Sequence, residues 1–159
     1  MVTKEEMETR TFVDSVKRPR EAHFVTAAEM QRFEQNKSLN DDVYKVINDY
    51  TKKHDIKPKY EGLEEICQLS ETTLKKSVAG TIKITRLFLY KLTVGLHLSL
   101  EEANMLFAKC GGALREDCKE DYVCLKALEH GDDILTFIHQ FNEFCKDKFQ
   151  QGEKLKIIF

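Results

Sequence analysis

The sequence predicts an all-α protein. The 159 residues include only two prolines and seven glycines, so few residues interrupt long helices. Apolar residues recur at helical spacing in several segments, whereas the alternation typical of a strand is almost absent. The one segment with strand character is Lys156-Ile157-Ile158-Phe159. A hydrophobic fraction of 42% with 33% charged residues is typical of a globular chain that forms a core without metal or disulfide.

Neither a membrane span nor a secretory signal is expected. No stretch approaches the ~18 consecutive apolar residues of a membrane span, and the segment Met1–Glu6 is too charged for an export signal. Five cysteines, an odd number without such a signal, favour reduced thiols. The sequence therefore predicts a cytoplasmic protein.

Residues 1–39 are expected to form an N-terminal appendage with one short helix. Its basic run, Lys17-Arg18-Pro19-Arg20, is typical of a solvated linker, and the alternative is an arm that contacts phosphate. Thr26 and Glu29 have the spacing of a capping box, which predicts a helix over about 27–36.

Residues 40–112 are expected to form one domain of five helices. The first begins near Asn40 and ends before Lys57-Pro58, because the residue before a proline is pushed out of helical geometry. The others are expected over about 62–68, 71–79, 84–97 and, from the capping box Ser99/Glu102, up to Gly111-Gly112. Their shared core is predicted to contain Leu63, Cys67, Leu69, Leu74, Leu87, Leu92, Leu96 and Phe107.

Residues 113–159 are expected to form an acidic C-terminal helical extension. Two helices are predicted, over about 118–130, capped by Asp117 with Glu120, and over about 133–149, capped by Asp132. The aromatic residues of the last helix favour core packing, and the alternative is a face for dimerisation or a partner; they are Phe137, Phe141, Phe144 and Phe149.

The most informative segment runs from Leu63 to Gly80, with the sequence LEEICQLSETTLKKSVAG. It resembles the helix-turn-helix of the lambda repressor and Cro (Xre-type) family. In that family a small residue lies inside the first helix, an apolar residue and Ser or Thr mark the turn, an apolar residue plugs the second helix into the core, and Gly ends it. The corresponding residues here are Cys67, Leu69-Ser70, Leu74 and Gly80.

The resemblance covers about residues 41–112, because the closing Leu96-His97-Leu98-Ser99 of the next helix is also similar. It implies a five-helix lambda-repressor-like domain that presents the helix at 71–79 to the major groove of double-stranded DNA, usually as a two-fold pair. A homodimer through the C-terminal helices is therefore expected. The side chains expected to face the DNA are Ser70, Glu71, Thr72, Thr73, Lys75, Lys76 and Ser77, with Lys83 as a backbone contact.

Charge leaves two hypotheses open. Residues 57–91 carry seven Lys or Arg against four Glu, a net charge of +3, which favours a DNA-binding transcriptional regulator. The same segment has no Arg on the helix at 71–79, and its glutamates oppose binding to phosphate; they are Glu61, Glu64, Glu65 and Glu71. Residues 101–147 carry a net charge of −6, from five basic against eleven acidic residues. The alternative is therefore a protein-interaction module that keeps the fold and has lost DNA binding.

Neither a metal site nor a catalytic site is predicted. Structural zinc sites show close-spaced ligand pairs, and such pairs are absent among Cys110, Cys118, Cys124, Cys145 and His139. Phosphate loops and dinucleotide-binding motifs are absent too, and Gly111-Gly112 is interpreted as a helix stop. We therefore expect no cofactor and no enzymatic activity.

Overall fold

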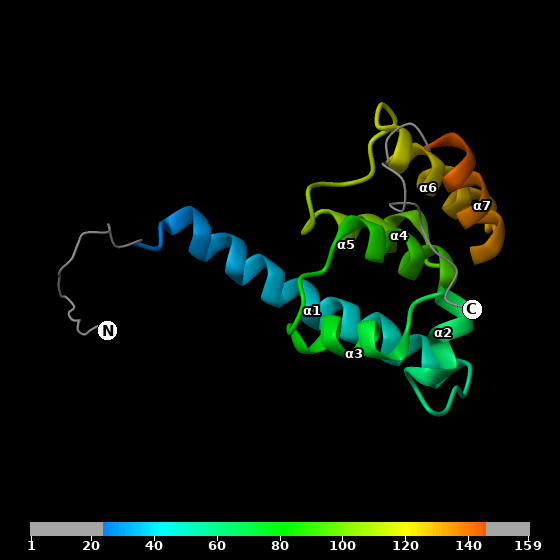
Figure 1. Ribbon diagram of the computed structural model, residues 1–159, viewed down its shortest axis with the longest axis horizontal. Helices are drawn as coiled ribbons and strands as arrows, with labels where there is room; N and C mark the ends of the chain where they lie inside the picture. Colours follow the sequence, from blue (N-terminus) through cyan, green and yellow to red (C-terminus); the bar gives the residue numbers. More distant parts are fainter. Residues whose placement is uncertain (1–23, 146–159) are drawn as a thin grey trace. The chain divides into compact units, whose positions relative to one another are not determined.

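The computed structural model describes residues 24–145, apart from the side chains of residues 35–37, and this part of the chain contains helices and no strand (Figure 1). The all-α class is therefore confirmed. The expected strand at 156–159 and the basic run at 17–20 lie outside the described residues. The chain divides into two compact units, Met1–Arg32 and Phe33–Phe159.

Helix α1 spans Ala27–Lys53 as one continuous helix. The predicted capping box is confirmed, because the Glu29 N–H donates to Thr26 Oγ1 (3.1 Å) and the Thr26 N–H donates to Glu29 Oε1 (2.8 Å). The predicted division into two helices, with a new start near Asn40, was wrong. Asp42 does not begin a helix; its carboxylate accepts a hydrogen bond from Lys109 Nζ at 2.5 Å, a partner 67 residues away.

Five helices cover residues 41–110, as predicted. After α1 come a single 3-10 turn at Glu61–Leu63 and the short helix α2 (Glu64–Cys67). The remaining three are α3 (Glu71–Ala79), α4 (Arg86–Gly95) and α5 (Leu100–Phe107). The capping box of Ser99 and Glu102 at the start of α5 is confirmed. The starts of α3, α4 and α5 follow from a local signal, the capping side chains of Ser70, Thr85 and Ser99, whereas α2 starts without a side-chain cap.

Two further helices follow, α6 (Lys119–His130) and α7 (Ile134–Phe144). Their predicted caps need correction. Cys118, not Asp117, is the N-cap of α6, and its side chain makes no capping bond; Asp117 pairs with Arg115 instead. The N-cap of α7 is Asp133 rather than Asp132, and its carboxylate accepts from the Thr136 N–H at 2.8 Å.

Helix α4 is the centre of the core. Every residue from Phe88 to Gly95 is buried, and α4 contacts α2, α5, α6 and α7. A mostly apolar helix is typical of such a central position. The predicted core is confirmed except for Leu87, which is half-buried, while its neighbours Phe88 and Leu89 are buried.

Helix α7 contributes part of its aromatic set to this core. Phe137 and Phe141 are fully buried and lie against the ring of Tyr90 on α4, with centroids 6.5 and 5.6 Å away. Core packing is thus confirmed for these two. Phe144 is 58% exposed, so it does not belong to the core, and Phe149 lies outside the described residues.

Candidate nucleic-acid interface

Helix α3 is fixed at both ends by local hydrogen bonds. Gln68 ends α2 in a left-handed conformation (φ 55°), which turns the chain towards Ser70. Ser70 Oγ accepts from the Thr73 N–H at 3.1 Å and also bonds Thr73 Oγ1 at 2.8 Å. Gly80 (φ 80°) terminates α3, as predicted, and the Thr81 N–H reaches back to the Lys76 carbonyl at 2.9 Å. The helix is therefore held in one orientation.

One face of α3 is buried. Leu74 is fully buried, as predicted for the residue that plugs the helix into the core, and Val78 packs against the core one turn later. Ser77 is also buried, so the expectation that it faces outward was wrong. Positions 74, 77 and 78 share one face of a helix, which explains its burial.

The opposite face of α3 is polar. Thr72, Lys75 and Lys76 are exposed, and Lys83 is exposed in the segment after the helix. Within residues 24–145, no carboxylate pairs with Lys76 or Lys83. Ser70, Glu71 and Thr73 are half-buried, and the hydroxyls of Ser70 and Thr73 are engaged in the cap.

Carboxylates surround the N-terminal end of α3. Glu64 Oε2 accepts from the backbone N–H of Glu71 at 2.7 Å. The carboxylate of Glu71 pairs with Lys75 Nζ at 2.8 Å, and this hydrogen bond raises the pKa of Lys75. The first turn of α3 is therefore occupied by the protein's own acidic groups, and Lys75 is partly neutralised.

Two basic residues counted in the +3 charge of residues 57–91 are engaged within the protein. Arg86 bonds Asp121, and Lys91 is buried on α4, where burial lowers its pKa to about 8. Without these two residues, the segment has five exposed or half-buried lysines and four glutamates, which gives a net charge of +1. The position of Lys91 within the apolar run from Leu87 to Leu96 is the sequence signal for its burial.

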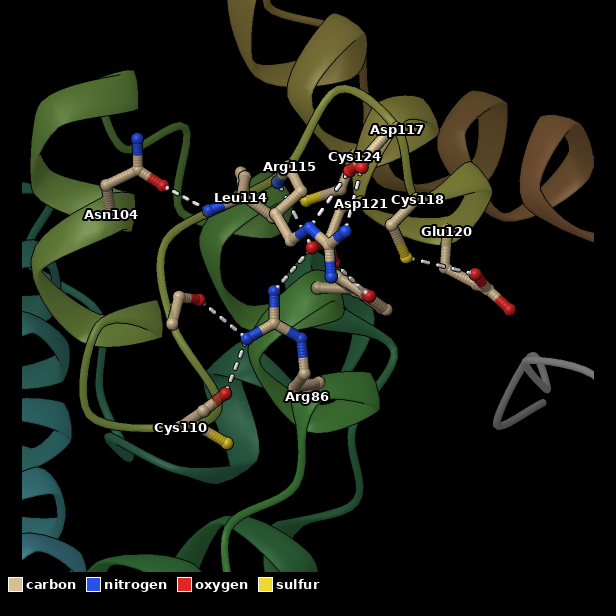
Figure 2. A network of polar contacts seen from close by, with 12 residues as sticks. Arg86, Asn104, Cys110, Leu114, Arg115, Asp117, Cys118, Glu120, Asp121 and Cys124 are labelled. Carbon is tan, nitrogen blue, oxygen red and sulfur yellow. Dashed lines mark hydrogen bonds and ion pairs between the residues drawn. The ribbon is translucent and has the colours of Figure 1, made fainter.

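A buried polar network joins α4 to α6 (Figure 2). The carboxylate of Asp121 is buried and accepts from Arg86 (2.7 Å), from the Tyr90 hydroxyl (2.5 Å) and from the Arg115 N–H (3.2 Å). Arg86 Nη1 also donates to the carbonyls of Cys110 and Gly112. No local signal in the sequence indicates this network, because Tyr90 and Arg86 lie 31 and 35 residues away from Asp121 along the chain.

The described cysteines are all free thiols. Burial raises the pKa of Cys67 and of Cys124 to about 12, so neither is a ready nucleophile at neutral pH. Among residues 24–145, no three His, Cys, Asp or Glu side chains are grouped as metal ligands would be. In the same part of the chain, the helices are too short or too polar to span a bilayer.

Comparisons with protein-family models, with curated proteins and with solved structures gave no significant match to this chain. The geometry and charge of α3 and the surface around it are therefore the features that bear on function.

Proposed function

We propose that this chain is a cytoplasmic DNA-binding transcriptional regulator of lambda-repressor-like fold that places α3 in the major groove. The observation that supports the proposal most is α3 itself. It is a nine-residue helix, capped by Ser70, terminated by Gly80 and anchored by Leu74, and its other face is polar. With its side chains an α-helix is ~10–12 Å across, which suits a major groove ~12 Å wide.

The exposed side chains of this face suit a duplex. Lys76 and Lys83, which lack a described carboxylate partner, supply phosphate or guanine contacts, and Thr72 suits a phosphate or a thymine methyl group. Lys75 contributes less, because Glu71 already pairs with it.

The proposed regulator acts as a homodimer, because helix-turn-helix readers usually bind two half-sites. The C-terminal helices offer an exposed surface for pairing, with Tyr122 on α6 and Phe144 on α7. Tyr122 and Phe144 line one hollow of about 450 Å³ between these helices.

The second candidate is a protein-interaction module with the same fold. The observation that favours it is the acidic first turn of α3, where Glu64 accepts from the Glu71 N–H. A free N-terminal turn attracts phosphate, and a carboxylate there repels it. In this reading, α3 docks on a protein surface rather than on DNA.

Gel retardation of genomic DNA fragments at low salt tests the proposal. Wild-type protein is expected to retard a subset of fragments, and Lys76→Ala should flatten the slope of log affinity against log salt by ~0.9 if one phosphate contact is lost. Lys76→Ala is preferable to Lys75→Ala, which would leave Glu71 uncompensated. Lys53→Ala is the matched control, since Lys53 lines a separate hollow beside His97.

Glu71→Gln is the second arm of this experiment. It should change sequence preference if Glu71 accepts from a cytosine amine, or tighten binding uniformly if Glu71 repels the backbone. Wild-type protein that retards no fragment at low salt would overturn the DNA proposal and leave the interaction module as the explanation.

A further inference from the structure

The structure holds Lys59 in an unusual position for a surface lysine. Its ammonium lies 5.0 Å from the ring centroid of Tyr44 on α1 and 5.7 Å from that of Tyr60. Two aromatic rings restrict the side chain, because the face of each ring attracts the ammonium. The pKa of Tyr44 is lowered by its hydrogen bond with Asn48 and next by the charge of Lys59, in agreement with this placement.

No described carboxylate neutralises Lys59. Two nearby lysines do have carboxylate partners. Lys57 pairs with Asp55, and Lys75 on α3 pairs with Glu71. Lys59 also lines a hollow of about 500 Å³ with Lys52, Lys57 and Asp55, so three lysines and one aspartate surround that hollow. The surface around this hollow therefore carries a net positive charge.

Tyr60 connects Lys59 to the candidate interface. Burial raises the pKa of Tyr60, and the positive charge of Lys75 acts on the same hydroxyl in the opposite direction. After Glu71, the charges of Tyr60 and Glu61 also raise the pKa of Lys75. Tyr60, whose ring Lys59 contacts, is therefore close enough to Lys75 on α3 for the charge of Lys75 to act on its hydroxyl, so Lys59 lies in the neighbourhood of α3.

We propose that Lys59, held over the rings of Tyr44 and Tyr60, binds a backbone phosphate of the same DNA duplex on which α3 docks. This inference rests on the proposed function and extends it to residues that the motif around α3 does not include. A lysine restrained before binding loses less conformational freedom when it contacts phosphate, so the contact is stronger than that of an unrestrained surface lysine. It also helps to offset the repulsion from Glu61 and Glu64.

The competing explanation is structural, with Lys59 only attaching its loop to α1. The variant Lys59→Met separates the two, because it keeps an unbranched apolar stem over the rings and removes the charge. Lys59→Arg keeps the charge. Lys53→Met is the matched control. Lys53 follows Lys52 in the last turn of α1, but it lines a different hollow, beside His97, and not the one that Lys59 lines.

The experiment measures binding of the full chain to a mixed-sequence DNA duplex over a range of KCl concentrations. Lys59→Met should reduce the salt slope by ~0.9, whereas Lys59→Arg and Lys53→Met should leave it unchanged. Acetylation of lysines in the wild-type complex, read by mass spectrometry, gives a second measurement that needs no variant. DNA should protect Lys59 and leave Lys53 reactive.

The outcomes distinguish this inference from the proposed function. If wild-type protein binds DNA and Lys76→Ala reduces the slope, but Lys59→Met does not and Lys59 is acetylated equally with and without DNA, Lys59 is only structural and the proposed function stands. If the wild-type protein binds no DNA at low salt, both fail. If Lys59→Met does not fold, the acetylation pattern alone decides.

Discussion

Gly95 on α4 lies directly against the backbone of Cys67 on α2. A Cβ atom at position 95 would be 2.8 Å from Cys67 Cα, 2.9 Å from its Sγ and 2.7 Å from the Ile66 carbonyl oxygen. Two of these neighbours are backbone atoms, which move only if a helix moves. The absence of a side chain at Gly95 and the small size of Cys67 together allow α2 and α4 to approach closely, and this contact sets the position of the turn that leads to α3.

Gly95→Ala is therefore expected to destabilise the protein by ~1–3 kcal/mol, the usual cost of overpacking a core. At an uncrowded helix position the same substitution would stabilise by ~0.5–1 kcal/mol, because alanine is the better helix former. Urea unfolding followed by circular dichroism measures the difference. A Gly95→Ala protein more stable than wild type would contradict the close approach of the two helices.

Asp121→Ala should be strongly destabilising. Asp121 is buried and accepts from both Arg86 and Tyr90, so its removal leaves the charge of Arg86 without a carboxylate and the Tyr90 hydroxyl without this acceptor, although Arg86 still donates to two backbone carbonyls. Breaking one side of a buried pair typically costs ~3–5 kcal/mol. Asp117→Ala is the matched control, because Asp117 forms an exposed pair with Arg115 at 2.8 Å, and solvent screening makes such a pair contribute far less to stability. Equal losses in the two variants, measured by urea unfolding, would show that the network does not hold α6 on α4.

Local signals predicted the boundaries of α3 and the start of α5 well. The cap at Ser70, the left-handed Gly80 and the capping box of Ser99 and Glu102 each depend on residues within a few positions of one another. The outward position of Thr72, Lys75 and Lys76 followed from the same local geometry, once Leu74 was assigned to the core. Ser77 was misplaced because polarity was given more weight than its position beside Leu74 and Val78.

Long-range pairs account for what the sequence did not predict. Asn40 was interpreted as a helix start, yet Asp42, two residues later, lies inside α1 and pairs with Lys109, 67 residues away along the chain. Arg86 was counted as surface charge, because nothing in its own segment indicates Asp121, 35 residues later. Helical periodicity reports which face is apolar and does not report which distant polar groups meet.

Leu74→Ala should bring the domain close to unfolding. Truncation of a buried leucine costs ~2–5 kcal/mol, which is a large part of the stability of an ordinary small domain. Lys76→Ala, on the exposed face of the same helix, should change stability by less than ~0.5 kcal/mol. Thermal unfolding of both variants tests the assignment of the two faces, and similar melting temperatures for the two would refute it.

Lys91 predicts a specific pH dependence of stability. Burial lowers its pKa to about 8, although the nearby Cys67 acts in the opposite direction. A lowered lysine pKa means that the folded state disfavours the charged form. The cost is therefore complete below about pH 8, where Lys91 is charged in both states. It disappears as the pH rises towards ~10.4, where an unfolded lysine also loses its proton.

Lys91→Met, of similar length and without charge, should therefore be more stable than wild type at neutral pH, and its advantage should shrink as the pH approaches ~10. The comparison must be made between the two proteins at each pH, because burial also raises the pKa of Cys67 to about 12. Unfolded thiols ionise near ~8.5, so both proteins lose stability above that pH. Lys53→Met is the control for the loss of a lysine side chain, since Lys53 is exposed. Urea midpoints measured across this range test the prediction, and a Lys91→Met advantage that stays constant from neutral to alkaline pH would show that Lys91 does not titrate in the folded protein as described.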